Sequence, residues 1–391
     1  MRLQRHEKMP SVSYRGVHSA SHKSCSTPRY FSVVWIESCQ GSNCILLMAS
    51  PNGDVFLIVE QETDILRPSS ICLSGKKLGD LTGTLPNEPV HFKLDAKGEK
   101  VEFRAGRFKS KLSGTQSEQF PEVPRVAGES LKIAAAVFYE GLKRTVFAVA
   151  EANQRFTING ILLLVEDSSL KMVSTDGHRL CFFRMATGLG NSENLRCLIP
   201  IKAVRELKSI LAYEIRRDAK AEIKIRKGSQ LEFEIGNKRL TAREITGNFP
   251  NWEMVIPKDF EFFAEINAKE FGEALTRVGV MADDTHRRIE FTFYPDKVSL
   301  KSESPETGHS VEELNCTFQK LMDSAENEPS GEGWKIAFNT KYIADFLSVH
   351  SGAARRDHLR IIWKFGRGKS QTEMMFEGEE KLFSYILVPL K

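Results

Sequence analysis

Apolar and polar residues alternate along this chain in blocks that recur about every 130 residues. The segments 90–125 and 221–257 both alternate over short runs joined by glycine turns, and both end in Phe-Pro. A third segment, which starts at Leu359, has the same rhythm and closes on Val388–Pro389. Alternation with a period of two predicts half-buried strands, and self-similarity at this spacing indicates repeated domains rather than a solenoid.

Helical patterns recur in step with the strands. Two sets of segments place apolar residues at three- and four-residue spacing, which predicts amphipathic helices that each bury one face. The residues that begin the first set suit a helix N-cap or a first turn. The first set comprises segments 74–85, 200–211 and 339–350, which begin at Ser74, Pro200 and Asn339, and the second set comprises segments 135–155 and 268–288.

Each repeat therefore has the order helix, strands, helix, strands. One-faced helices beside alternating strands predict an α+β fold, in which two helices cover one face of an antiparallel sheet in each of three tandem domains. The first repeat lacks a periodic apolar segment where the others have their first helix. The expected boundaries are 1–26 for a divergent or disordered N-terminus, 27–126 for a first domain with an incomplete first helix, 127–257 for the second domain and 258–391 for the third.

The net charge of +4 resides in the N-terminal segment rather than in the body of the chain. Residues 1–29 contain six basic residues and one acidic residue, so the remainder carries a net charge of −1. Bulk charge thus gives no indication of nucleic-acid binding, which would need a local basic surface. The Arg- and Ser-rich composition leaves three interpretations of residues 1–26 open: a disordered terminus, a targeting segment or a misassigned start.

The sequence argues against several classes of protein. Its seven cysteines form no C-x-x-C pair and have no histidine partners at finger spacing, so we expect reduced thiols and no metal site. The longest apolar runs fall far short of the ~18 residues of a membrane helix, and residues 1–25 contain no apolar signal sequence, which predicts a cytoplasmic protein that binds no membrane. The sequence has no phosphate-binding G-x-x-x-x-G-K-[ST] loop, so we do not expect it to hydrolyse nucleotides.

Four short motifs carry a specific resemblance. They are TDGHRL at Thr175–Leu180, FPNWEMVIP at 249–257, AFNTKYIADFL at 337–347 and the C-terminal SYILVPLK. In this order on a threefold repeat, they resemble bacterial sliding clamps, the beta subunit of DNA polymerase III, from about residue 30 to the C-terminus. The resemblance implies a non-enzymatic protein without cofactors, which keeps a polymerase at high effective concentration on DNA.

The resemblance further implies a homodimeric ring around double-stranded DNA, with helices lining the hole and sheets outside. A ring holds DNA by topology and needs only weak phosphate contacts, which suits a body of low net charge. The alternative for each basic residue on the helical segments is the solvated face of an amphipathic helix. The residues expected to face DNA are Lys143, Arg144, Arg155, Lys202, Arg205, Lys208, Arg277 and Lys341.

A peptide groove between the second and third domains is also implied. It would bind short apolar segments of the DNA polymerase III catalytic subunit, the clamp loader and other replication or repair proteins. Met254 stands where the family commonly has a basic residue, and Lys391 ends the sequence without a following apolar residue, which predicts an altered peptide preference. The groove residues implied by the resemblance are Ile158, Thr175, Gly177, His178, Arg179, Leu180, Pro250, Met254, Val255, Asn339, Tyr342, Ile386, Val388, Pro389 and Leu390.

The expected dimer contact joins a strand of the first domain to the end of a helix of the third. Ser110 stands where the resemblance places an aromatic residue, although Phe108 is near. Because of this difference and the missing first helix, the main alternative is a clamp-like relative that binds peptides without forming a closed ring. The expected contact residues are Arg107, Phe108, Lys109, Ser110, Val280 and Met281.

Asp176 and His178 allow one further hypothesis, a hydrolase with a catalytic dyad. The sequence around them lacks a serine or cysteine nucleophile in the strand-turn-helix context that such chemistry uses. Asp-Gly is also a common turn, which would leave His178 and Arg179 at the rim of a site. The sliding clamp is therefore the leading hypothesis.

Overall fold

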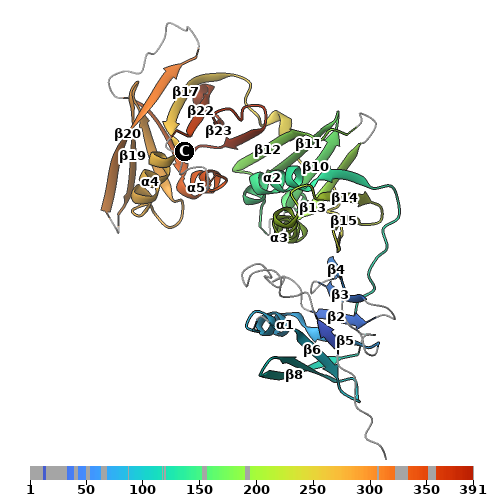
Figure 1. Ribbon diagram of the computed structural model, residues 1–391. Coiled ribbons are helices and arrows are strands. Elements are labelled where there is room, and N and C mark those ends of the chain that lie inside the picture. Colours follow the sequence, from blue (N-terminus) through green and yellow to red (C-terminus); the bar gives the residue numbers. More distant parts are fainter. Residues whose placement is uncertain are drawn as a thin grey trace, which may run out of the picture. The chain divides into compact units, whose positions relative to one another are not determined.

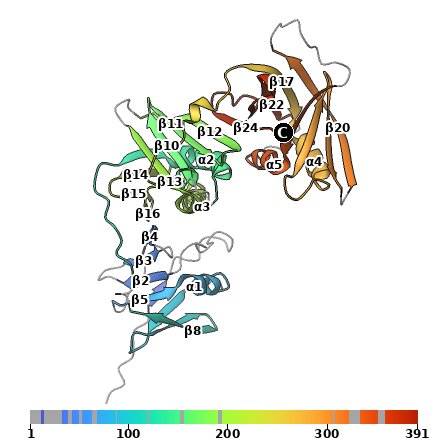
Figure 2. The same ribbon diagram turned by 180° about the vertical axis from the view of Figure 1, so that it is seen from behind.

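The computed structural model divides the chain into two compact units, each built on one twelve-stranded sheet (Figures 1 and 2). The first unit comprises Met1–Tyr139 and Lys202–Glu244, and the second comprises Glu140–Ile201 and Ile245–Lys391. The structure describes residues 12–14, 33–38, 43–49, 53–62, 68–86, 88–116, 118, 120–151, 156–189, 194–305, 308–321, 333–350 and 358–390.

The sheet of the first unit joins strands of the first and second repeats. Its strand order is β1-β6-β7-β8-β5-β2-β3-β4-β16-β15-β14-β9, and neighbouring strands are antiparallel. The strands are β1 (Val12–Tyr14), β2 (Val33–Ser38), β3 (Asn43–Ala49), β4 (Val55–Glu62), β5 (Ser70–Ser74), β6 (Val90–Leu94), β7 (Lys100–Ala105), β8 (Phe108–Thr115), β9 (Leu131–Ala134), β14 (Glu222–Lys227), β15 (Leu231–Ile235) and β16 (Lys238–Ala242).

The sheet of the second unit joins strands of the second and third repeats. Its order is β13-β10-β11-β12-β24-β23-β22-β17-β20-β19-β18-β21, again antiparallel. The strands are β10 (Gly160–Glu166), β11 (Ser169–Thr175), β12 (Arg179–Ala186), β13 (Leu195–Pro200), β17 (Phe260–Asn267), β18 (Arg288–Phe293), β19 (Lys297–Ser304), β20 (Gly308–Lys320), β21 (Trp334–Asn339), β22 (Arg360–Gly366), β23 (Thr372–Phe376) and β24 (Phe383–Leu387).

The α-helices fall on the predicted segments. Ser74 and Asn339 act as N-caps, because their side-chain oxygens accept hydrogen bonds from the backbone N–H groups of Lys77 and Lys341. The patterns over 135–155 and 268–288 overestimate the helices, which end at Thr145 and Gly279, and the pattern over 200–211 underestimates its helix, which runs to Arg217. The helices are α1 (Gly75–Thr82), α2 (Ala135–Thr145), α3 (Ile201–Arg217), α4 (Ala268–Gly279) and α5 (Thr340–Ser348), with 3₁₀ turns at Val146–Ala148, Phe156–Ile158, Trp252–Met254 and Arg367–Lys369.

Helices bury their apolar faces on one side of each sheet, as the one-faced pattern predicts. In the first unit, Leu78 of α1 packs in a cluster with Val34 and Leu73 of the sheet. In the second unit, Phe271 of α4 lies 6.1 Å from Trp363, measured between ring centroids, and both side chains are fully buried. Burial of large aromatic side chains is the main favourable term that holds such layers together. The α+β class predicted from the sequence is confirmed.

The first strand of each repeat pairs with the equivalent strand of its own repeat. Strand β1 pairs with β6, β9 pairs with β14, and β17 pairs with β22. Val12–Tyr14 thus forms the opening strand of the first repeat, although it lies within the segment expected to be divergent or disordered. The exact domain boundaries stay predictions, since the two units divide the second repeat between them.

Successive repeats are linked by two strand pairings of one kind, which we call joints. Each repeat has two halves, each with a run of three successive antiparallel strands: β2–β4 and β6–β8 in the first repeat, β10–β12 and β14–β16 in the second, and β18–β20 and β22–β24 in the third. In a joint, the last strand of one repeat's first run pairs with the last strand of the next repeat's second run. The first joint pairs Val55–Val59 of β4 with Lys238–Ala242 of β16. The second joint pairs Arg179–Phe183 of β12 with Phe383–Leu387 of β24. Both ladders are five residues long, so the two joints are directly comparable.

Two strands at equivalent positions have no joint partner among the described pairings. Strand β8 ends the second half of the first repeat, and β20 ends the first half of the third. Strand β8 pairs with β7 along its length but with β5 only at its end, at Gly114 and Thr115. Strand β20 pairs with β19 over its first part and reaches β17 only from Cys316 onward. Each strand therefore keeps an open edge of about the length of a joint.

Candidate functional site

The TDGHRL motif forms the turn between β11 and β12. Gly177 has a φ of +93°, a left-handed conformation that favours glycine. Asp176 stabilises the turn, because its Oδ1 accepts hydrogen bonds from the backbone N–H groups of His178 at 3.0 Å and Arg179 at 3.1 Å. The hydroxyl of Thr175 donates to the carbonyl of Arg179 at 2.7 Å. This arrangement leaves the His178 side chain exposed and turns Arg179 inward.

Arg179 is the polar centre of the site. Its side chain is only 6% exposed, and all three of its nitrogens have partners. Nε donates to Asp176 at 2.9 Å, Nη1 to Asp345 at 2.7 Å, and Nη2 to the Phe147 carbonyl at 2.7 Å. The guanidinium lies 4.4 Å from the centre of the Tyr342 ring, close enough for a cation–π contact. A buried cation with complete partners fixes the geometry around it, and removal of one partner would be costly.

Tyr342 and Tyr385 connect α5 to this centre. The hydroxyl of Tyr385 donates to the Tyr342 carbonyl at 3.0 Å, and the Tyr385 side chain is fully buried. Burial raises the pKa of both tyrosines, so both stay neutral donors. Burial alone would lower the pKa of Arg179, but Tyr385, Asp345 and Asp176 together raise it. The exposed His178 ring lies nearly parallel to Tyr342, with centroids 6.3 Å apart.

An apolar cluster lies beside Arg179 on the second joint. The register of β12 with β24 places Leu180 opposite Ile386, and both are buried with Ile158 in one cluster. Val255 and Trp252, from the segment that links the second and third repeats, pack against this cluster while partly exposed. The site thus combines an apolar floor with a few fixed polar groups, which is the chemistry of a site for a short apolar peptide.

The C-terminal segment passes directly beside the TDGHRL turn. The backbone N–H of Val388 donates to the His178 carbonyl at 3.0 Å, and that of Leu390 donates to the Ala337 carbonyl at 2.7 Å. Val388 keeps 38% of its surface exposed. Asn339, at the start of α5, uses its side-chain oxygen to cap the helix. These contacts hold the C-terminal residues next to α5 and the turn.

The predicted groove residues differ in how the structure places them. A connected set is formed by Ile158, Thr175, Gly177, His178, Arg179, Leu180, Val255, Tyr342, Ile386 and Val388. Pro250 and Met254 are exposed on the linking segment, and Met254 is 82% exposed. Pro389 and Leu390 are partly exposed, and Lys391 lies outside the described residues. Peptide binding by this set stays a prediction.

Sequence reasoning missed three residues of the polar centre: Asp345, Tyr385 and Phe147. A usable signal existed for Asp345, because it follows Tyr342 by three positions on α5 and so lies on the same helix face. For Tyr385 and Phe147 the sequence offered no comparable signal, since their contacts depend on the pairing of β12 with β24.

Arg144, which was expected to face DNA, is buried instead, so that expectation is wrong. Its side chain is 4% exposed. Nη1 and Nη2 donate to the two carboxylate oxygens of Glu379 at 2.6 and 2.8 Å, and Nε donates to Glu140 at 2.9 Å. This forked pair links α2 of the second repeat to the β23–β24 turn of the third. The guanidinium is used within the chain and is not available to phosphates.

Glu379 also contacts His350, at the end of α5. The His350 Nε2 lies 3.0 Å from Glu379 Oε1. Burial alone would raise the pKa of Glu379, but interactions with His350 and Arg144 lower it to about 2. The carboxylate is therefore ionised at any pH near neutral. The Arg144–Glu379 ion pair is thus a second ion pair beside the second joint, in addition to the Arg179–Asp345 pair.

The other predicted DNA-facing residues are more accessible than Arg144. Lys341 is exposed, and Lys143, Lys202, Arg205 and Lys208 are partly exposed. Arg277 has 57% of its side chain exposed and donates through Nε to Glu312 at 2.9 Å. Arg155 lies outside the described residues. None of these roles is tested by the fold, and they stay predictions.

Exposed apolar side chains gather at the two open strands. Phe108 begins β8 and is 36% exposed, and Val311 on β20 is 54% exposed. Val280, directly after α4, is 72% exposed. Lys109 and Lys111 of β8 are exposed and basic, whereas the edge of β20 carries Glu312 and Glu313. Two open edges of opposite charge with exposed apolar residues are features of interaction surfaces.

The geometry does not support a hydrolase. Asp176 contacts His178 through the backbone N–H and spends its second oxygen on Arg179, so the two side chains form no dyad. In the part of the chain that the structure describes, no group of three or more His, Cys, Asp or Glu residues could hold a metal ion. None of the described helices is long and apolar enough to cross a membrane.

Comparison with known proteins identifies the fold. The chain superimposes on the sliding clamp of Pseudomonas aeruginosa with a TM-score of 0.81 and 21% identity, over 98% of this chain and 100% of that one. The Bacillus subtilis clamp gives a TM-score of 0.79 with 21% identity and the same coverage. At this identity the two structures establish the fold alone.

Sequence comparisons extend this result to the family. The chain is 28% identical to the beta sliding clamp of Synechocystis over 307 residues, which cover 73% of this chain and 75% of that protein. It is 28% identical to the clamp of Staphylococcus epidermidis over 293 residues, which cover 74% and 73%. Family models for the central and C-terminal domains of the DNA polymerase III beta subunit match residues 132–251 and 253–356, together more than half of the chain. The chain therefore belongs to the family of bacterial beta sliding clamps, the non-catalytic processivity subunit of DNA polymerase III.

Proposed function

We propose that two copies of this chain close into a ring that encircles duplex DNA in the cytoplasm and tethers the replicative polymerase. The observation that carries the proposal is the pair of open strands. The chain contains two joints of one kind. Its two open strands, β8 and β20, are the strands that would form a third joint between two copies. A head-to-tail contact of this type either closes into a ring or continues as a filament. Two copies with three repeats each would close a ring of six repeats through four internal and two intermolecular joints.

The register of the intermolecular joint follows from the internal ones. A two-residue turn separates β7 from Phe108, and a turn of the same length separates β15 from Lys238. Phe108–Leu112 is therefore equivalent to Lys238–Ala242, the strand segment that forms the first joint. The hydroxyls of Ser174 in β11 and Ser302 in β19 each donate to a backbone carbonyl near the end of the preceding helix, at Thr145 and Val278. Ser174 pairs with Cys181 and Ser302 pairs with Ser310, which aligns β20 with β12. The resulting register pairs Phe108–Leu112 of one copy with Gly308–Glu312 of the other, antiparallel, so that Ser110 faces Ser310.

The side chains at the two open ends complement one another in this register. In the second joint, the Arg144 guanidinium lies 5.3 Å from the centre of the Phe383 ring. Arg277 lies at the position of α4 that matches Arg144, and Phe108 lies at the position that matches Phe383. The exposed Phe108 of one copy would therefore cover the exposed Arg277 of the other. In this register Lys109 of β8 would lie opposite Val311 and diagonal to Glu313, which places one basic residue of β8 beside the acidic edge of β20.

The DNA-facing role belongs to the helices. Three helices of the same kind carry a lysine at the same position, one in each repeat: Lys76, Lys202 and Lys341. Lys76 and Lys341 are exposed and Lys202 is partly exposed. Six such lysines in a closed ring would give weak, evenly spaced phosphate contacts that permit sliding. Lysine is suited to this use because its ammonium group is a mobile point charge without directional demands.

Tethering belongs to the site around Arg179. An apolar peptide segment of the polymerase catalytic subunit or the clamp loader would pack on Leu180, Ile386 and Val255, and the polar centre would orient its backbone. Exposed Met254 at its rim adds a flexible apolar contact where a charge is common in the family. This favours clients with apolar rather than acidic flanks.

A topological assay tests the ring. The protein is loaded onto nicked circular duplex DNA by a clamp loader and ATP, washed at high salt, and the DNA is then linearised. We expect retention on the circle at high salt and release after linearisation, because salt screens phosphate contacts but does not open a ring. Release from the intact circle by salt would instead establish a peptide-binding relative without a closed ring.

A further inference from the structure

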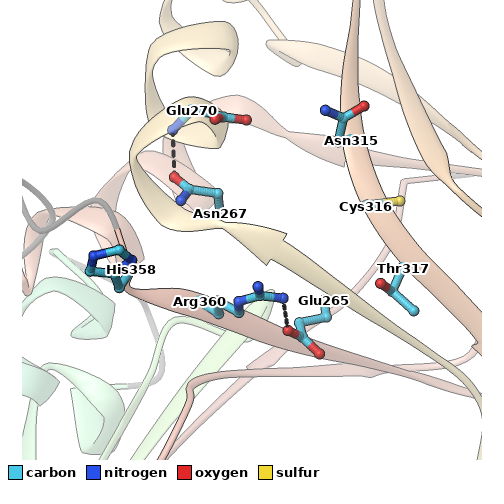
Figure 3. A pocket seen from close by; sticks show the side chains of 8 residues that line it. All are labelled: Glu265, Asn267, Glu270, Asn315, Cys316, Thr317, His358 and Arg360. Atoms are coloured by element: carbon cyan, nitrogen blue, oxygen red, sulfur yellow. Dashed lines mark hydrogen bonds and ion pairs between the residues drawn. The ribbon is translucent and has the colours of Figure 1, made fainter.

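A polar cavity of about 410 Å³ opens on the third repeat, in the part of the fold where β17 ends and β20 leaves it (Figure 3). Its lining comes from β17, α4, β20 and β22, and from His358 just before β22. Glu265 and Asn267 come from β17, Glu270 from the first turn of α4, and Asn315 and Thr317 from β20. None of the predicted peptide-site or DNA-facing residues lines this cavity.

The lining contains two carboxylates and several neutral polar groups, together with Arg360 and His358. Glu265 is paired with Arg360, which also lines the cavity. Glu270 donates its backbone N–H to Asn267, and its exposed carboxylate has no ion-pair partner among the described residues. The amide oxygen of Asn315 and the hydroxyl oxygen of Thr317 supply further acceptors, whereas the amide oxygen of Asn267 already caps α4. A group with several N–H donors and a positive charge fits such a lining best.

The cavity lies at the end of the open edge of β20. Strand β17 pairs with β20 as far as Ile266 and Cys316, and residues 308–315 leave that edge free for another strand. Glu313, Asn315 and Thr317 alternate with buried or inward residues, so they share the outer face of the strand. Glu265 is paired opposite Thr317 and shares this face.

In both internal joints, one further backbone hydrogen bond follows the end of the five-residue ladder. In the first joint, the backbone N–H of Glu60 donates to the carbonyl of Asn237 at 3.0 Å. In the second, the N–H of Arg184 donates to the carbonyl of Leu382 at 2.8 Å. Each contact joins the residue after one five-residue strand to the residue before the other. In the intermolecular joint the corresponding residues are Glu313 and Arg107.

We propose that the cavity receives the side chain of Arg107 from a second copy of the chain. This proposal rests on the ring proposed above and assigns to it a specific pocket. Arg107 is exposed in the β7–β8 turn, and in the expected register it would lie opposite Glu313 on the outer face. The two-residue step from Glu313 to Asn315 is about 7 Å along the strand, which brings the cavity next to the long side chain of Arg107. Its planar guanidinium would bind the carboxylate of Glu270 and the amide oxygen of Asn315 together.

A double-mutant cycle on the dimer tests the pocket. Sedimentation equilibrium of the full chain gives the dimer dissociation constant for the unaltered protein, Arg107→Gln, Glu270→Gln and the double variant. Since each ring contains two such joints, we expect each single change to weaken the dimer about tenfold or more, and the double variant to be no weaker than either single one. Glu253→Gln, an exposed change away from the cavity, is the control and should leave the constant unchanged.

The outcomes separate the pocket from the ring. A normal dimer constant for Glu270→Gln, or strictly additive losses in the double variant, would overturn the pocket while the ring stands. An unaltered chain that stays monomeric at every concentration would overturn both. Circular dichroism of each variant checks folding, and restored dimerisation when Arg107→Glu chains are mixed with Glu270→Arg chains would support the contact even if either variant alone is weakened.

Discussion

Arg144 and Arg277 occupy the same position in two equivalent helices, yet their surroundings are opposite. Arg144 is 4% exposed and is held by Glu379 and Glu140 in the second joint. Arg277, 133 positions later, is 57% exposed and pairs at the surface with Glu312. The helices are alike, so the difference comes from the joint, which is filled in one case and open in the other. In a protein built of repeats, a residue that is buried in one repeat and exposed at the equivalent position of another therefore marks a surface that is free for a further contact.

The largest effect should come from breaking the filled joint. We expect Arg144→Ala to lower the free energy of unfolding by about 3 kcal/mol, because it removes a buried guanidinium and leaves the largely covered Glu379 with His350 alone beside it. Arg277→Ala should cost less than about 1 kcal/mol, because it removes only a surface pair. Denaturant unfolding at a protein concentration that keeps the chain monomeric compares the two. Equal losses would contradict the difference between the joints.

Acid should weaken the filled joint next. The pKa of Glu379 is lowered from 4.5 to about 2 in the folded chain. Its ionised carboxylate therefore stabilises the fold fully at pH values above the pKa of the unfolded chain. This contribution, about 3 kcal/mol at most, should be lost as pH falls from about 4.5 to 2. Glu379→Gln should remove that part of the pH dependence while lowering stability at neutral pH. An unchanged pH profile for the variant would rule out this role for Glu379.

Glu206 offers the reverse case at the first joint. Glu206 on α3 is at the position that Asp345 has on α5. Asp345 pairs with Arg179 of β12, but the equivalent residue of β4 is Val55, which cannot form an ion pair. Burial raises the pKa of Glu206 to about 7, so its ionisation opposes folding. Stability should fall as pH rises from about 4.5 to 7, and Glu206→Gln should recover up to about 2 to 3 kcal/mol at pH 8. Thermal denaturation across this range would show the gain, and a less stable variant at pH 8 would contradict it.

The smallest effects concern the peptide site. Tyr342→Ala should weaken binding of an apolar client peptide by about 1 to 3 kcal/mol, since it removes the ring that lies over Arg179. Tyr342→Phe keeps the ring and should bind almost normally. Deletion of residues 388–391 should cause a loss in the same range as Tyr342→Ala. Titration calorimetry distinguishes these cases, and equal affinity for Tyr342→Ala would show that the peptide binds elsewhere.

Much of this architecture could be predicted from local sequence. The N-caps at Ser74 and Asn339, the helical faces and the strand repeats follow from short-range spacing. The burial of Arg144 could not be predicted, because a charged residue next to Lys143 on an amphipathic helix is expected to face solvent and only the pairing of β12 with β24 brings Glu379 to it. For the same reason Tyr385 was missed, since its role depends on strand register. Long-range pairing, rather than local propensity, decides which equivalent residues become functional.

Cysteine cross-linking between copies tests the intermolecular joint most directly. Ser110 and Ser310 face one another in the predicted register, as Tyr385 and Cys181 do in the second joint, at a separation that suits a disulfide. A chain with Ser110→Cys and Ser310→Cys should form a covalent dimer with two links that stays on circular DNA in denaturant. A chain with Ser110→Cys and Val311→Cys, whose side chains would lie on opposite faces, should link poorly. Absence of the first link, or equal linking by both pairs, would contradict the third joint.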